Sequence, residues 1–102
     1  MRRGDVWWYE PPDTMRRPFV VLSRDVIVSR LGRVLAVPAT AVVRSIPTEV
    51  ALDESDGMPQ PCVLSLDNIQ PISKAFCTEQ ITRLGPDKLR AVCEALRVAV
   101  DC

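Results

Sequence analysis

The sequence of 102 residues contains no histidine. Histidine is the side chain that most often transfers protons in enzymes near neutral pH, and it is the commonest metal ligand. Its absence excludes Ser–His–Asp and Cys–His nucleophilic pairs, two-histidine acid–base mechanisms and His-rich metal sites. Any catalysis by this chain therefore has to use Arg, Lys, carboxylate, hydroxyl, thiol or Tyr side chains.

Cysteine pairs and long apolar runs are lacking as well. The four cysteines are Cys62, Cys77, Cys93 and Cys102, and no two of them have CxxC spacing, so we expect no zinc site. No apolar run approaches the roughly 18 residues of a membrane span, and the N-terminal segment has no apolar signal core. We therefore expect a cytoplasmic protein that has free thiols and makes no contact with membranes.

The length is typical of one domain, so residues 1–102 are expected to fold as a single unit. The 13 basic and 13 acidic residues cancel in the whole chain, but the two halves differ in sign. Residues 1–51 carry eight Arg and five acids, whereas residues 52–102 carry five basic and eight acidic residues. This distribution permits a basic patch for a polyanion in the first half, although the charge alone favours scattered surface Arg.

Five short segments have the composition of β-strands, with turn-forming residues between them. They are residues 6–9, 18–23, 33–42, 48–52 and 62–66. Residues 18–23 are apolar on both faces, which predicts a strand buried on two sides or one in the wall of a barrel. Pro38 interrupts the third segment and predicts a bulge or an edge there. Residues 53–61 are acidic and rich in Pro and Gly, which predicts a solvated loop.

A single amphipathic helix is predicted to begin at Pro86. Its apolar side chains recur at helical spacing and form one stripe: Leu89, Val92, Cys93, Leu96, Ala99 and Val100. Pro86 suits the first helical turn, and Asp87 suits the positive end of the helix dipole. Five strands followed by a helix predict a mainly β fold, a small antiparallel barrel with a C-terminal helix packed on it.

Five motifs in this order resemble the MazF/PemK toxin family. They are MRRGDVW at residues 1–7, RPFVVLS at 17–23, VPAT at 37–40, DN at 67–68 and TRL at 82–84. Together they span nearly the whole chain. The resemblance implies an SH3-like barrel that forms a homodimer, a cofactor-free and metal-independent endoribonuclease that cuts single-stranded RNA, and a cognate antitoxin that blocks the RNA groove.

The resemblance also implies three catalytic candidates. Arg17 aligns with the family's catalytic arginine and Thr40 with its catalytic threonine, and both side chains can donate hydrogen bonds to phosphate oxygens. Some relatives place an Arg and an Asp two residues apart after the fifth strand, where this chain has Ser65 and Asp67. The Arg is missing, so Asp67 is either a proton acceptor, a reader of a base edge, or a cap of the next turn.

Five further residues are candidates for RNA binding. Arg16 is suited to attract backbone phosphate, Ser23 and Arg44 are expected near the groove, and Asn68 and Gln70 offer donors and acceptors to unstacked bases. Trp7 and Trp8 alternate along a strand, so at most one of them faces RNA, and we expect both to serve the core or a dimer contact. Residues 11–16 and 43–47 are expected to set the sequence preference.

Two other functions remain open at this point. Related toxins use the same barrel to bind a protein target such as DNA gyrase without catalysis. A non-catalytic RNA-binding module is the other alternative. The pair formed by Arg17 and Thr40 favours the ribonuclease, because a gyrase binder has no need of it.

Overall fold

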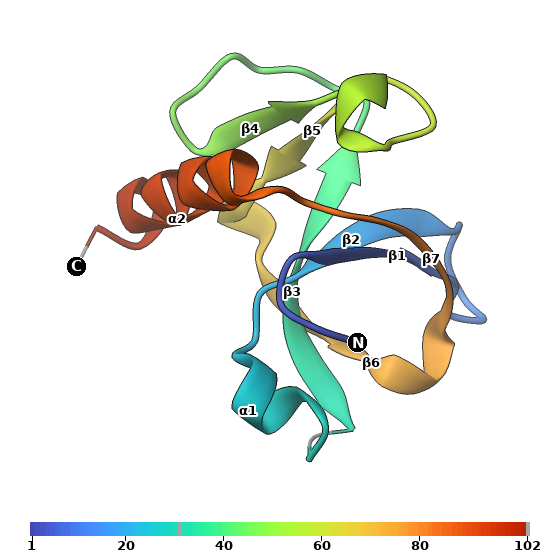
Figure 1. Cartoon of the computed structure of the whole chain (residues 1–102). Coiled ribbons are helices and arrows are strands. Elements are labelled where there is room, and N and C mark those ends of the chain that lie inside the picture. The colour runs from blue at the N-terminus through green and yellow to red at the C-terminus, as the bar shows by residue number, and fades with distance from the viewer. Residues whose placement is uncertain (31, 102) are drawn as a thin grey trace.

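The computed structural model describes residues 1–30 and 32–101, which form a seven-stranded antiparallel sheet and a C-terminal helix (Figure 1). The strands are β1 (Asp5–Tyr9), β2 (Arg17–Val21), β3 (Arg33–Thr40), β4 (Glu49–Leu52), β5 (Cys62–Ser65), β6 (Gln70–Ser73) and β7 (Cys77–Arg83). The helices are α1 (Asp25–Val28) and α2 (Pro86–Val100), and short 3₁₀ turns span Glu54–Asp56, Leu66–Asn68 and Lys74–Phe76. The predicted mainly antiparallel fold with a C-terminal helix is confirmed.

Strand β3 organises the sheet because it pairs with three other strands. The order is β4-β5-β3-β2-β1-β7, and β6 also pairs with β3. Along its second edge β3 pairs with β6 from Arg33 to Ala36 and with β5 from Ala39 to Thr40. Pro38 falls between these two stretches, where β3 changes its partner strand. Proline has no backbone N–H to donate to a ladder, and at this change of partner residue 38 pairs with neither β5 nor β6. Proline is therefore tolerated there, and no bulge is needed.

Strand β2 is buried on both faces, as its apolar run predicts. Val20 belongs to one core cluster, whereas Phe19 and Val21 belong to another. The first cluster lies between the sheet and α2, and the second is packed by residues at the other side of the barrel, including Trp7 and Tyr9. Alternating side chains of one strand therefore fill two cores, which holds the start of β2 rigidly beside β3.

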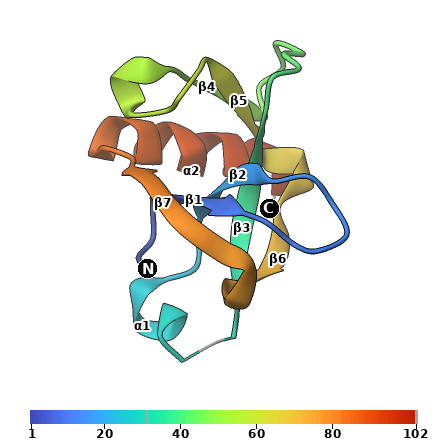
Figure 2. The same cartoon turned by 90° about the vertical axis from the view of Figure 1, so that its right-hand side faces the viewer.

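Helix α2 begins at Pro86, as predicted, and lies beside β4 (Figures 1 and 2). Val92 and Ala95 are its buried residues, and Leu89, Leu96 and Ala99 pack against the first core cluster. Two members of the predicted stripe differ: Val100 is exposed, and Cys93 Sγ contacts the Arg3 guanidinium at 3.0 Å. No helix in the described part of the chain is long and apolar enough to cross a membrane.

The structure contains three elements that the sequence pattern did not predict. Strand β6 contains Pro71 and has a single buried side chain, Ile72, and α1 is a single turn within a mixed segment. Among the strands of the described residues, β7 pairs with β1 alone, and it is largely exposed, so its sequence CTEQITR shows no apolar alternation. An edge strand buries few side chains, and period-2 patterning therefore fails to reveal it.

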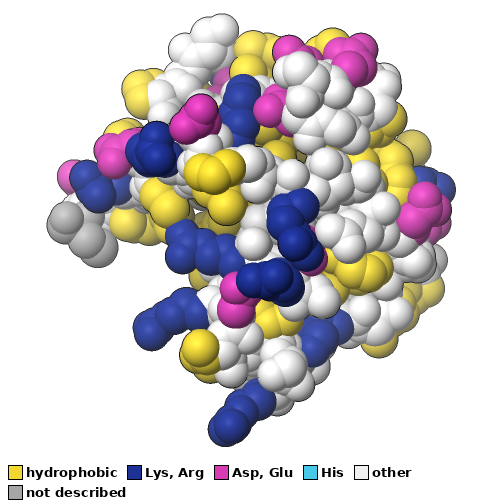
Figure 3. Space-filling view, in the orientation of Figure 1, with side chains coloured by type: hydrophobic (Ala, Val, Ile, Leu, Met, Phe, Trp, Pro, Cys, Tyr) yellow, Lys and Arg dark blue, Asp and Glu magenta, His cyan; other side chains and the backbone are white. Residues whose placement is uncertain are grey.

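Charged side chains are unevenly distributed over the surface (Figure 3), although ion pairs such as that of Lys88 with Asp56 also bring opposite charges together. In Figure 3, acidic side chains gather over the turn that joins β4 to β5, and basic side chains lie over the part nearest the N-terminus. The acidic turn is a capped 3₁₀ turn in which the Asp53 carboxylate accepts the Ser55 N–H at 2.9 Å. Hydrogen bonds from Ser55 are the main cause that lowers the pKa of Asp53.

Candidate functional site

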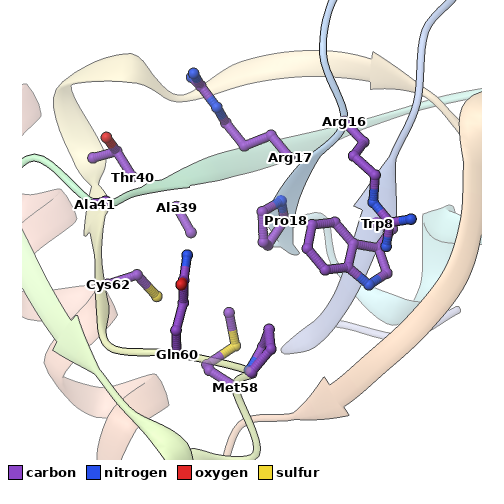
Figure 4. A pocket seen from close by; sticks show the side chains of 11 residues that line it. Trp8, Arg16, Arg17, Pro18, Ala39, Thr40, Ala41, Met58, Gln60 and Cys62 are labelled. Carbon is purple, nitrogen blue, oxygen red and sulfur yellow. The ribbon is translucent and has the colours of Figure 1, made fainter.

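The pairing of β2 with β3 places Arg17 and Thr40 side by side. In this ladder Phe19 lies opposite Pro38 and Val20 opposite Val37. Extending the same register by two residues puts Arg17 opposite Thr40, at the end of the sheet where β2 starts and β3 ends. Both residues line one cleft of about 340 Å³ (Figure 4). Two residues 23 positions apart in the sequence are thus brought together by two rigid strands.

This first cleft is lined by both polar and apolar side chains. Arg17 and Thr40 lie along one side, and the Gln60 amide points into the space from the opposite side (Figure 4). Trp8, with Arg16 over its ring, closes one end. The remaining lining residues are Pro18, Ala39, Ala41, Met58, Pro59 and Cys62. The arrangement offers a cation, a hydroxyl and an amide above an apolar floor.

Arg17 and Thr40 are both available to a ligand. Arg17 is exposed, and its guanidinium makes no ion pair or hydrogen bond with any residue that the structure describes. Thr40 Oγ1 accepts the Val42 N–H at 3.2 Å, so its own O–H hydrogen remains free to donate. An unpaired guanidinium beside a hydroxyl donor provides two directed donors for an anion such as phosphate.

Arg17 also lines a second cleft, of about 500 Å³. This cleft lies under the loop between β1 and β2, and its other lining residues are Tyr9, Pro11, Asp13, Thr14, Met15, Phe19 and Gln70. Gln70 therefore shares a cleft with Arg17, and its Nε2 donates to the Asn68 carbonyl at 3.1 Å. Arg17 is the residue shared by the linings of the two clefts.

Asp67 and Asn68 lie outside the linings of both clefts. They belong to the 3₁₀ turn that follows β5. Asp67 Oδ2 accepts the Thr48 hydroxyl at 2.5 Å, and Asn68 Nδ2 donates to Ser65 Oγ at 3.0 Å. The Asp67 side chain thereby links this turn to Thr48, and the Asn68 side chain links it to Ser65 in β5, while no side-chain cap hydrogen bond forms at the turn among the described residues.

Ser23 and Arg44, two further RNA-binding candidates, lie in different environments. Ser23 is buried, and its Oγ accepts the Leu35 N–H at 2.8 Å, so it holds the chain after β2 against β3 rather than lining a cleft. Arg44 is exposed in the loop of residues 41–47, which projects from the end of β3 (Figure 2). The Glu49 carboxylate accepts the backbone N–H groups of Arg44 and Ser45 at 3.0 and 2.9 Å and so shapes this loop.

Sequence reasoning did not identify Trp8 and Gln60 as site residues. Trp7 packs against the second core cluster, as expected, but Trp8 lines the cleft with the Arg16 guanidinium carbon 3.8 Å from its ring centroid. Strand alternation showed that the two rings face opposite ways, but it did not show which one faces the cleft. Gln60 lies in a loop, where no periodicity indicates the direction of a side chain.

Cys62 lines the cleft but is a poor candidate for a nucleophile. Burial, followed by the nearby Asp56 carboxylate, raises the pKa of its thiol above the ordinary range. The thiolate is the reactive form of cysteine, so Cys62 is protonated and unreactive near neutral pH. Among the described residues there is no group of three or more Cys, Asp or Glu side chains that could hold a metal ion.

Comparison with known proteins agrees with this fold and cleft. A curated relative from Mycobacterium tuberculosis (strain ATCC 25618 / H37Rv), "Probable endoribonuclease MazF5", is 44% identical over 101 residues, which cover 98% of this chain and 93% of that protein. The solved structure of M. tuberculosis toxin MazF-mt6 is 33% identical, has a TM-score of 0.87 and covers 95% of this chain and 96% of its own.

A further solved structure is titled as an endoribonuclease in complex with its cognate antitoxin from Mycobacterial species. It is 25% identical, with a TM-score of 0.89, and covers 99% of this chain and 95% of its own. Residues 2–100 match the family model described as "PemK-like, MazF-like toxin of type II toxin-antitoxin system". The chain belongs to this family of PemK-like and MazF-like toxins.

Proposed function

We propose that this chain is an endoribonuclease toxin that cuts single-stranded RNA at short sequences without a metal ion. The single observation that carries the proposal is the unpaired Arg17 guanidinium beside the Thr40 hydroxyl in one cleft. A guanidinium and a hydroxyl are suited to a phosphate that gains negative charge during the reaction. The names of the relatives, which are endoribonucleases, support the same activity.

The proposed reaction is attack of a ribose 2′-OH on the adjacent phosphate. The new bond joins the 2′-oxygen to phosphorus, and the bond from phosphorus to the 5′-oxygen breaks. The products are a 2′,3′-cyclic phosphate and a 5′-OH end, and the proton lost by the 2′-OH is balanced by the proton gained by the 5′-oxygen. Arg17 and Thr40 donate hydrogen bonds to the two non-bridging oxygens. These hydrogen bonds align the phosphate and stabilise its developing charge.

Two carboxylates are candidates for accepting the 2′-OH proton. Asp67 is the candidate that the family resemblance implies, and the Thr48 hydroxyl holds it outside the clefts. Asp13 is the carboxylate that lines the second cleft together with Arg17. Replacing each with Asn and measuring the rate against pH separates them, because only loss of the true acceptor removes the acidic limb of the profile.

Besides substrate RNA, we propose two partners for this chain: an antitoxin and a second copy of the chain. Because a similar endoribonuclease is titled as a complex with its cognate antitoxin, we propose that this chain also binds an antitoxin and that the antitoxin competes with RNA. A homodimer in the cytoplasm would place two copies of this site in one particle. Light scattering of the purified chain tests the dimer directly.

The test of the function is mapping of RNA ends after incubation of total RNA with the purified protein in EDTA. We expect discrete cuts that carry 5′-OH ends, made by the wild-type protein and by Arg24→Ala, but not by Arg17→Ala. Arg24 is a matched control because it is an exposed arginine outside both clefts. Intact RNA with the folded wild-type protein would overturn the proposal and favour a binding function, such as capture of gyrase.

A further inference from the structure

We propose that the first cleft contains a nucleobase subsite, in which Trp8 and Arg16 stack on the base beside the scissile phosphate and Gln60 reads the edge of that base. The inference rests on the proposed ribonuclease function, and it names how the same site selects its sequence. It adds Trp8 and Gln60 to the binding residues and gives Arg16 a more specific role than attraction of phosphate.

The stack of Arg16 on Trp8 is the first observation. The guanidinium carbon lies 3.8 Å from the ring centroid, the spacing of two stacked planar groups. Trp8 is only half-buried and lies opposite Pro18 in the ladder of β1 with β2. Pro18 directly follows Arg17 in the chain. Single-stranded RNA is bound through bases that stack on aromatic rings and on arginine planes. This wall is therefore suited to the flat face of a base.

The size and the floor of the cleft are the second observation. Its volume of about 340 Å³ lies near the lower end of the roughly 300–1,000 Å³ that is usual for small-molecule sites, so it suits one nucleoside unit. Pro18, Met58 and Cys62 make the floor apolar beneath the stack. Arg17 and Thr40 also line this cleft, and in Figure 4 their side chains extend away from Gln60. A phosphate and the base next to it need this combination of charged and apolar surface.

Gln60 is the third observation. Its amide points into the cleft (Figure 4) and makes no hydrogen bond with any residue within 1–30 and 32–101. Met58, two residues earlier, is 3% exposed and belongs to the first core cluster, so the loop that carries Gln60 is anchored in the core. A carboxamide offers a donor and an acceptor side by side, which is the pattern that pairs with the edge of a base.

The test is cleavage of a pool of short oligoribonucleotides with randomised sequence, read by sequencing the cut ends. We expect Gln60→Ala to cut with a preference relaxed at one position next to the cut, by about tenfold, because one paired base contact is lost. Gln80→Ala is the matched control: Gln80 is exposed on β7, its amide donates to the Thr82 carbonyl, and it lies outside both clefts. An unchanged motif in Gln60→Ala would overturn the inference.

Trp8 is tested by binding, with Trp7→Phe as the background so that Trp8 is the sole tryptophan. The probe is the mapped substrate with 2′-O-methyl at the cut position, which removes the attacking hydroxyl. We expect quenching of Trp8 fluorescence on binding. We also expect affinity to fall about tenfold or more in Trp8→Leu and much less in Trp8→Phe, which keeps a ring and guards against loss of folding.

Failure of the subsite and failure of the proposed function give different results. A wild-type protein that cuts no RNA overturns both proposals. A wild-type protein that cuts a defined motif, which Gln60→Ala and Trp8→Leu then cut with the same preference and affinity, overturns the subsite alone. If these two variants weaken binding of an antitoxin peptide but leave the RNA motif unchanged, the cleft serves the partner protein, and the nucleobase subsite is wrong.

Discussion

Replacing Gly57 with alanine perturbs the loop that carries one side of the cleft. Gly57 ends the Glu54–Asp56 turn with φ 93° and ψ 9°, in the left-handed region that side chains disfavour. A Cβ at this position would lie 2.3 Å from Thr82 Oγ1 and 2.7 Å from Thr82 Cβ, closer than such atoms come in proteins. Thr82 has little freedom to move, because its hydroxyl donates to the Asp56 carbonyl at 3.1 Å.

The expected loss of stability has two parts. A non-glycine residue in the left-handed region costs about 1–2 kcal/mol, and crowding in a packed region costs about 1–3 kcal/mol. Together they lower the free energy of unfolding by about 2–5 kcal/mol, a large share of the roughly 5–15 kcal/mol of a typical domain. For a chain of this length that corresponds to a fall in melting temperature of at least about 8 °C.

Two further variants separate the causes. Asparagine tolerates the left-handed region, so Gly57→Asn keeps the crowding and loses about 1 kcal/mol less than Gly57→Ala. Gly85→Ala is the control, because Gly85 has φ −73° and an added Cβ meets no atom within 4 Å apart from its chain neighbours; since glycine is preferred over alanine at the N-cap of α2, we expect a loss of about 1 kcal/mol at most. Urea unfolding of all four proteins measures these differences. Equal stability of Gly57→Ala and Gly85→Ala would refute the placement of this loop.

Three further predictions concern the first cleft and the thiols. Thr40→Val should lower the cleavage rate about 100-fold and Thr40→Ser only a few-fold, because serine keeps the donor; single-turnover kinetics measure both. Arg16→Ala should weaken RNA binding about tenfold in filter-binding titrations but change the slope of log affinity against log salt by less than the roughly 0.7 of one phosphate contact, because Arg16 stacks on a base. Burial raises the pKa of Cys62 and Cys77, so the unfolded chain releases these protons first and stability should fall as pH rises through about 8.5. The urea midpoint should fall between a pH below and a pH above this value, and it should fall less in the Cys62→Ala/Cys77→Ala variant than in wild type. An equal fall in the two proteins would contradict the attribution of the pH dependence to these two thiols.

The elements that sequence patterns predicted are those that bury side chains regularly. Strand β2 is apolar on both faces because it fills two cores, and α2 shows a stripe because one side packs on the sheet. Strands β6 and β7 were missed because their side chains are mainly exposed, so no apolar period marks them. Propensity alone does not distinguish such edge segments from loops.

Some residues of the candidate site were predicted from the sequence and others were not, because a sequence does not show which way every side chain points. Arg17 and Thr40 were selected by motif resemblance, and the register of β2 with β3 explains physically why they meet. Ser23 was misplaced because a buried serine that serves a backbone N–H looks the same in a sequence as one that faces a ligand. Gln60 was missed because the direction of a loop side chain depends on anchors such as Gly57, which only the folded chain reveals.

The most direct test of the account is the single-turnover rate of Arg17→Ala at one mapped cut site, measured beside wild type and Arg24→Ala. The account predicts that Arg17→Ala is folded but slower by about 100- to 1,000-fold, the usual effect of removing one donor to the transition state, and that Arg24→Ala matches wild type. Equal rates for the folded Arg17→Ala and Arg24→Ala proteins would contradict the central claim that the guanidinium in this cleft carries the cleavage.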